Sequence, residues 1–69
     1  RQSRLMASMY ADLVARLKAG GCWFVRTGKG SHEIWCSPIN GRAFTVPRSL
    51  ASAPLANAIL KQAGLPKAY

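Results

Sequence analysis

The sequence predicts an α+β domain with the element order α-β-β-β-α, in which two helices cover one face of a three-stranded antiparallel sheet. Three observations support this prediction. Apolar residues recur at helical spacing near both ends of the chain. Three short segments rich in aromatic or β-branched residues occupy the middle, and turn-forming residues separate them. With 69 residues the chain forms one small domain, so the helices and the sheet share a single core.

The first helix is expected over about residues 6–19. Its apolar stripe recurs every three or four positions and consists of Met6, Tyr10, Leu13, Val14 and Leu17. Ser3 or Ser8 can cap its start, and Lys18 lies near the end where the helix dipole favours a cation. The pair Gly20-Gly21 supplies a residue for the left-handed conformation that commonly ends a helix.

The three strands are expected to form a meander and to lie at residues 22–26, 32–37 and 42–46. The turn between the first two strands, residues 27–31, is rich in glycine. The turn between the second and third contains Asn40-Gly41, a pair that favours a type I′ hairpin turn. Pro47 closes the third strand because it has no N–H to donate.

A second helix is expected after Ser49 or Ser52, either of which can cap it. Pro54 is tolerated in its first turn. Its predicted apolar stripe, with Leu60 at the flank, consists of Leu55, Ala58, Ile59, Gln62 and Ala63. The run Gly64-Leu65-Pro66 combines a glycine cap with a helix breaker and ends the helix.

The charge balance points to an anionic partner. Ten Lys and Arg residues oppose only Asp12 and Glu33, which gives a formal net charge of +8. Such a field attracts polyanions, and nucleic acid is the leading candidate. An acidic protein, or a basic domain that associates with ribosomes, is also compatible with this charge. A single domain over residues 1–69, with a core at about 6–65, leaves no room for a cofactor domain or a deep substrate cavity.

Several classes of protein are not expected. No apolar run approaches the roughly 20 residues that span a bilayer, and residues 1–6 lack the apolar segment of a signal peptide. Cys22 and Cys36 are too few for a metal framework, and the chain has only one histidine. We therefore expect a cytoplasmic protein with reduced cysteines and with no metal, small-molecule cofactor or membrane partner. A disulfide between neighbouring strands is the alternative for the cysteines.

The candidate site centres on His32, because histidine alone has an unperturbed pKa near neutral pH. Glycines in the preceding turn, Gly28 and Gly30, let backbone N–H groups approach an anion. The predicted RNA contacts are Arg26, Lys29, Gly30, Ser31 and Arg42, and Glu33 is a candidate acid–base helper. RNA carries its own nucleophile, the ribose 2′-hydroxyl, so an enzyme that cleaves it needs mainly proton transfer and charge stabilisation.

Simpler interpretations of the same residues stay open. A lone histidine at a turn is more often a surface residue that forms hydrogen bonds than a catalyst. Trp23, Trp35 and Phe44 pack in a core or on a sheet face more often than they stack on bases. Three functions therefore compete: a ribonuclease, a non-catalytic basic RNA-binding module, and an interaction protein for an acidic polypeptide.

The chain resembles the HicA family of bacterial toxins over about residues 11–65. The resemblance is carried by Gly30-Ser31-His32 at the start of an aromatic strand, by Phe44-Thr45-Val46-Pro47, and by the ending Ile59-Leu60-Lys61-Gln62-Ala63-Gly64-Leu65. It implies a fold like that of double-stranded-RNA-binding domains. It also implies an mRNA-cleaving endoribonuclease that acts without metal and that a HicB-type antitoxin neutralises by direct binding.

The resemblance also assigns the active role to His32, with Gly30 and Ser31 in the same motif. Two departures stand out. Many relatives have a second histidine shortly after the Val-Pro pair, where this chain has Arg48-Ser49. Relatives also often enter the second helix through a basic segment rich in glycine and threonine, which residues 52–57 replace here.

Overall fold

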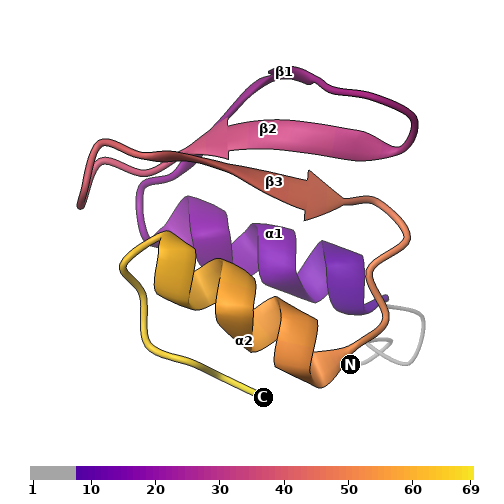
Figure 1. Ribbon diagram of the computed structural model, residues 1–69. Coiled ribbons are helices and arrows are strands. Elements are labelled where there is room, and N and C mark those ends of the chain that lie inside the picture. The colour runs from indigo at the N-terminus through magenta and orange to yellow at the C-terminus, as the bar shows by residue number, and fades with distance from the viewer. Residues whose placement is uncertain (1–7) are drawn as a thin grey trace.

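The computed structural model describes residues 8–69 and has the predicted element order and layers. The elements are α1 (Met9–Ala19), β1 (Trp23–Thr27), β2 (His32–Cys36), β3 (Ala43–Pro47) and α2 (Ala53–Gln62). The strands form an antiparallel sheet in the order β1-β2-β3, so β2 is central. Both helices lie against one face of the sheet and leave the other face uncovered (Figure 1). The predicted α+β fold is therefore confirmed.

The ends of α1 follow from local hydrogen bonds. The Ser8 hydroxyl accepts from the Ala11 N–H at 3.0 Å and caps the first turn, as one of the two predicted caps. Ser3 and Met6, the other cap and the first residue of the expected stripe, lie outside the described residues. At the other end Gly21 has a φ of 90°, and the Cys22 N–H donates to the Leu17 carbonyl at 2.9 Å. This is the Schellman arrangement that the glycine pair predicted.

The helices and one face of the sheet enclose a single core. Its buried apolar residues are Leu13, Leu17, Cys22, Trp35, Phe44, Val46, Leu50, Ala56, Ile59, Leu60 and Ala63. Trp35 and Phe44 lie opposite each other on neighbouring strands, which places both rings on the helix side. Of the three aromatic residues for which a core or sheet-face position was expected, these two pack in the core, whereas Trp23 is 49% exposed.

The predicted apolar stripe of α2 was partly wrong: Ile59 and Ala63 are buried as expected, but the other three residues are not. Leu55, Ala58 and Gln62 are exposed, whereas the side that packs in the core is formed by Ala56, Ile59, Leu60 and Ala63. Both sets fit a helical period, so the spacing alone does not fix which side is buried. Ser52 caps the helix and Pro54 lies in its first turn, as expected.

The turn between β2 and β3 also differs from the prediction. A type I′ turn needs positive φ at both Asn40 and Gly41, but among residues 8–69 only glycines have positive φ. The Gly41 N–H instead donates to the Ser37 carbonyl at 2.9 Å and forms a wider turn. The Asn40 side chain donates to the Gln62 carbonyl at 2.8 Å, which ties this hairpin to the end of α2.

Pairing between the strands decides which side chains share a face. Trp35 is buried against the helices, so its neighbours in β2 point to the opposite side. We call that side the helix-free face; its residues, taken from the register, are Trp23, Arg26, His32, Ile34, Cys36, Ala43, Thr45 and Pro47. A β-bulge at Val25 shifts the register of β1 between Phe24 and Arg26.

Two further expectations concern the cysteines and the membrane. Cys22 is buried in the core and Cys36 is half-buried on the helix-free face, and both are free thiols. Within residues 8–69, neither helix combines the length and the apolar content that crossing a bilayer would require.

The C-terminal segment packs back onto both helices. The Asn57 side chain accepts from the Ala68 and Tyr69 N–H groups and donates to the Tyr69 carbonyl. The Tyr69 hydroxyl donates to Asp12 of α1, and the Arg16 guanidinium lies 5.3 Å from the Tyr69 ring centroid. Hydrogen bonds from Tyr69 and Arg16 lower the pKa of Asp12, so this carboxylate is charged at neutral pH.

Candidate active site

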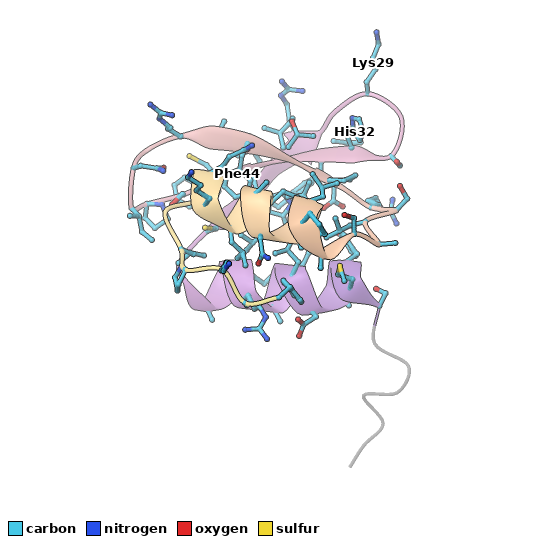
Figure 2. The ribbon with its side chains drawn as sticks, turned by 60° about the horizontal axis from the view of Figure 1, so that its bottom comes forward. Lys29, His32 and Phe44 are labelled. Atoms are coloured by element: carbon cyan, nitrogen blue, oxygen red, sulfur yellow. The ribbon has the colours of Figure 1, made fainter. Side chains whose placement is uncertain are left out.

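His32 is the first residue of β2 and lies at one end of the helix-free face. The hairpin before it is closed by two backbone hydrogen bonds, from the Gly28 N–H to the His32 carbonyl at 2.8 Å and from the His32 N–H to the Lys29 carbonyl at 3.1 Å. Its side chain is exposed. In Figure 2, His32 lies at the base of this hairpin and Lys29 extends from its tip. The backbone of the candidate proton carrier is thus fixed while the imidazole is open to a ligand.

The hairpin brings most of the predicted site residues together. Lys29, Gly30 and Ser31 form its exposed tip, and Gly30 has a φ of 61°. Arg26, near the end of β1, pairs with Ile34 and therefore lies on the same face as His32. The expectation for Gly28 was wrong, because its N–H already donates to the His32 carbonyl and does not face an anion.

Glu33 does not lie beside His32. Successive residues of a strand point to opposite faces, so the carboxylate lies on the helix side. There its Oε1 accepts from the Tyr10 hydroxyl at 2.7 Å and from the Trp35 Nε1 at 3.0 Å. Burial and this hydrogen bond from Tyr10 raise the pKa of the Tyr10 phenol. The geometry gives Glu33 a structural position and separates it from the imidazole.

Arg42 lies at the far end of the sheet from His32. Its carbonyl accepts from the Ser37 N–H, one residue beyond the end of β2. Five residues of strand separate Ser37 from His32, which is about 17 Å at the usual rise per residue. The same phosphate therefore cannot contact both Arg42 and His32 side chains directly.

Arg48 takes the position near His32 that the sequence interpretation gave to Arg42. Pro47 is the register partner of His32, and the Arg48 N–H donates to the Ser31 carbonyl at 2.9 Å. The Arg48 side chain is 65% exposed, and its Nε lies 3.8 Å from Glu33 Oε2. In the sequence, the position of Arg48 could be found only by pairing the second and third predicted strands across the Asn40-Gly41 turn.

These residues place three cations, which we call the cationic rim, near one proton carrier. Arg26 shares the face of His32, and Lys29 lies at the tip of the preceding hairpin. The backbone of Arg48 adjoins the same end of β2, and its guanidinium lies beside Glu33. Cations placed in this way can stabilise charge that develops on a phosphate, and the imidazole can accept or donate a proton beside it. Within residues 8–69, no three side chains of the types that ligate metals lie together.

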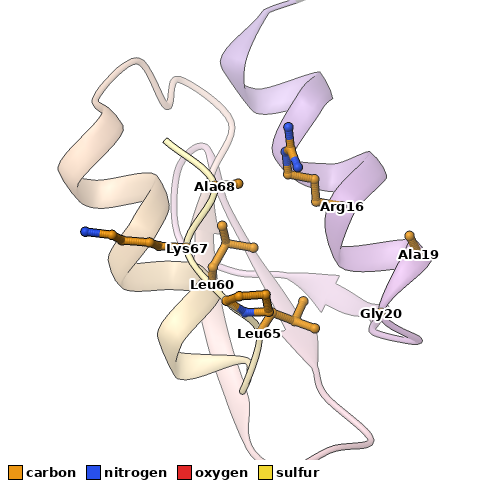
Figure 3. Close-up of a pocket in the computed structure, with 8 residues that line it drawn as sticks. Arg16, Ala19, Gly20, Leu60, Leu65, Lys67 and Ala68 are labelled. Atoms are coloured by element: carbon orange, nitrogen blue, oxygen red, sulfur yellow. The ribbon is translucent and has the colours of Figure 1, made fainter.

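A shallow cavity lies elsewhere, between α1 and the C-terminal segment (Figure 3). Its volume is about 360 Å³, and it is lined by Arg16, Ala19, Gly20, Leu60, Leu65, Pro66, Lys67 and Ala68. It is on the helix side, near the end of α1, whereas His32 lies on the helix-free face. This cavity is therefore separate from the candidate site.

Comparison with known proteins relates the chain to a family. Residues 10–65 match the family model described as "HicA toxin of bacterial toxin-antitoxin". No curated protein and no solved structure matches the chain. The matched range covers most of the chain and includes the hairpin, His32 and Arg48.

Proposed function

Because the chain belongs to the HicA toxin family of bacterial toxin–antitoxin systems, we propose that it is an endoribonuclease that cleaves mRNA with His32. The family makes the chain the toxin of such a pair. The observation that carries the catalytic proposal is the exposed His32 imidazole, on a fixed strand end near which Arg26, Lys29 and Arg48 lie. RNA is the polyanion for which one imidazole and a cationic rim supply most of the required chemistry.

The proposed reaction uses the nucleophile of the substrate. His32 removes the proton from a ribose 2′-hydroxyl, and the 2′-oxygen forms a bond to the neighbouring phosphorus. The bond from phosphorus to the 5′-oxygen breaks, and that oxygen takes a proton from Lys29 or water. The products are a 2′,3′-cyclic phosphate and a 5′-hydroxyl. Lys29 and Arg48 stabilise the charge on the phosphoryl oxygens during this step.

The proposed chemistry requires no metal ion, because the attacking oxygen comes from RNA and the charge is met by side chains. Cleavage should therefore continue in excess chelator. We further propose that the protein acts in the cytoplasm, where mRNA is found. A HicB-type antitoxin would neutralise it by binding directly over His32 and the surrounding cations.

A second candidate function is a non-catalytic RNA-binding module. The observation in its favour is that Glu33 points to the helix side, which leaves His32 without a carboxylate partner among residues 8–69. The same cationic surface would then hold RNA without cutting it. Binding that weakens steeply with salt, with intact RNA after long incubation, would support this alternative.

Induced expression separates the two functions. The chain and its His32→Ala variant are expressed from the same promoter, and growth and mRNA integrity are followed. The ribonuclease proposal expects growth arrest and fragmented mRNA with the parent chain and intact mRNA with the variant at equal protein level. Equal fragmentation by both proteins would remove His32 from the mechanism.

A further inference from the structure

The helix-free face carries an exposed aromatic side chain that the proposed reaction does not use. Trp23 is 49% exposed and pairs with Cys36, so it lies on the same face as His32. Cys36 is four residues from His32 along β2, or about 13 Å at the usual strand rise. One face therefore presents a proton carrier at one end and an indole ring at the other.

One arginine lies between these two side chains, and a second flanks the indole end. Arg26 is exposed and lies on this face between the rows of Trp23 and His32. Arg42 directly precedes Ala43, whose partner across the sheet is Cys36, so Arg42 flanks the Trp23 end. Neither acidic residue of the chain lies here, because Glu33 is on the helix side and Asp12 is on α1. The surface is complementary to an extended polyanion.

We propose that the helix-free face binds single-stranded RNA along β2, with the reacting phosphate at His32 and a base of a nearby nucleotide stacked on Trp23. This inference rests on the RNA part of the proposed function. Proteins bind single strands by combining a basic track with aromatic side chains on which bases stack. In a duplex the base faces are already stacked on each other, so an indole on an open sheet selects for unpaired nucleotides.

The neighbouring residue supplies a matched control. Phe24 is in the same strand and is 47% exposed, but it pairs with Trp35 and therefore lies toward the helix side. Its ring meets the Trp35 ring edge-on, with centroids 6.1 Å apart. Trp23→Leu and Phe24→Leu thus remove aromatic rings of similar exposure from opposite faces of one edge strand.

The test measures binding of a short single-stranded oligonucleotide whose 2′-hydroxyls are methylated, so that it lacks the proposed nucleophile. Trp23→Leu should weaken binding about 5- to 150-fold, the effect expected for losing one base–aromatic stack. Phe24→Leu should change binding less than about two-fold. The parent chain should also lose tryptophan fluorescence on binding, because its other tryptophan, Trp35, is 2% exposed, and Trp23→Leu should abolish that loss.

Other results would overturn the inference in distinguishable ways. If all three proteins bind equally and the parent still cleaves unmodified RNA, the stacking role of Trp23 fails and the ribonuclease proposal stands. If a blunt duplex binds as tightly as the single strand, the selection for unpaired bases fails. If Trp23→Leu weakens a complex with the antitoxin but not with RNA, the face belongs to the protein partner. If Trp23-dependent binding occurs without cleavage, the inference holds and the catalytic proposal fails.

Discussion

The two faces of the sheet differ in burial and in charge, although they are formed by alternate residues of the same strands. On the helix side, Trp35, Phe44 and Val46 are buried in the core, and the Glu33 carboxylate is held by Tyr10 and Trp35. On the helix-free face, Arg26, His32 and Thr45 are exposed. A domain of this size can therefore combine a core with a reactive surface, because successive residues of a strand point to opposite faces of the sheet.

Because the two faces are separate, substitutions on them should affect different properties of the protein. A small domain buries a modest share of its surface and has little stability to spare. Substitutions on the helix side should therefore act mainly on folding, and those on the helix-free face mainly on RNA.

The largest effect on stability is expected from Phe44→Ala, which removes a buried ring from the helix side. The free energy of unfolding should fall by about 3–5 kcal/mol, because the truncation leaves a cavity. Thr45→Ala is the control, since Thr45 is the next residue and is exposed on the opposite face; its effect should stay within about 0.5 kcal/mol. Urea denaturation measures both. Equal losses would show that the two faces are not separate in stability.

Glu33→Ala should lower the free energy of unfolding by about 1–3 kcal/mol, because it leaves the Tyr10 hydroxyl without its acceptor. The rate of RNA cleavage should fall less than about ten-fold. If Glu33 is instead the acid–base partner of His32, cleavage should fall by about 10²–10⁴ with folding corrected for. Denaturation and single-turnover cleavage of the same preparation distinguish the two roles.

Two arginines flank β3, Arg42 before it and Arg48 after it, and they lie at opposite ends of the sheet. Arg48→Ala should lower the rate of cleavage at saturating RNA by about 10- to 100-fold, because Arg48 adjoins the His32 end of the sheet. Arg42→Ala should weaken binding and reduce its salt dependence by about one unit of slope, with little change in that rate. If Arg42→Ala lowered the rate and Arg48→Ala weakened binding instead, the reacting phosphate would lie at the other end of β2.

The smallest expected effect is on the pH dependence of stability and arises from Asp12 of α1. Hydrogen bonds from Tyr69 and Arg16 lower the pKa of Asp12 below its value in the unfolded chain. The resulting stability is fully present above about pH 4, the ordinary carboxylate range, and is lost as the pH falls through the lower folded pKa. Because the Asp12 side chain is 45% exposed, solvent screening keeps this contribution below about 1 kcal/mol. Asp12→Asn should flatten the acid limb of a stability–pH curve and leave RNA cleavage unchanged.

Local chemistry made much of this fold predictable. Ser8, Ser52, Gly21 and Gly64 sit where helices begin or end, and each acts through neighbours within a few residues. The side of α2 that packs in the core was not predictable, because Leu55 and Leu60 both fit a helical period. The place of the β2–β3 turn was predicted, but its type was not, and the bond from Asn40 to Gln62, 22 residues away, could not be read from the local pair Asn40-Gly41.

In the candidate site, residues adjacent in the chain were also predictable, whereas residues brought together by strand pairing were not. The hairpin residues Lys29, Gly30 and Ser31 adjoin His32 in the chain, so the sequence placed them correctly beside it. Arg48 comes near only through the pairing of β3 with β2, and Glu33 leaves the site because adjacent strand residues face opposite sides. Both depend on a register that a single sequence does not specify.

The most direct test of the account is the single-turnover rate of RNA cleavage by purified His32→Ala, measured together with its free energy of unfolding. The rate should fall by about 10²–10⁴. Stability should change by less than about 0.5 kcal/mol, since His32 is exposed on the helix-free face. A variant that folds and cleaves RNA as fast as the parent chain would contradict the assignment of catalysis to His32.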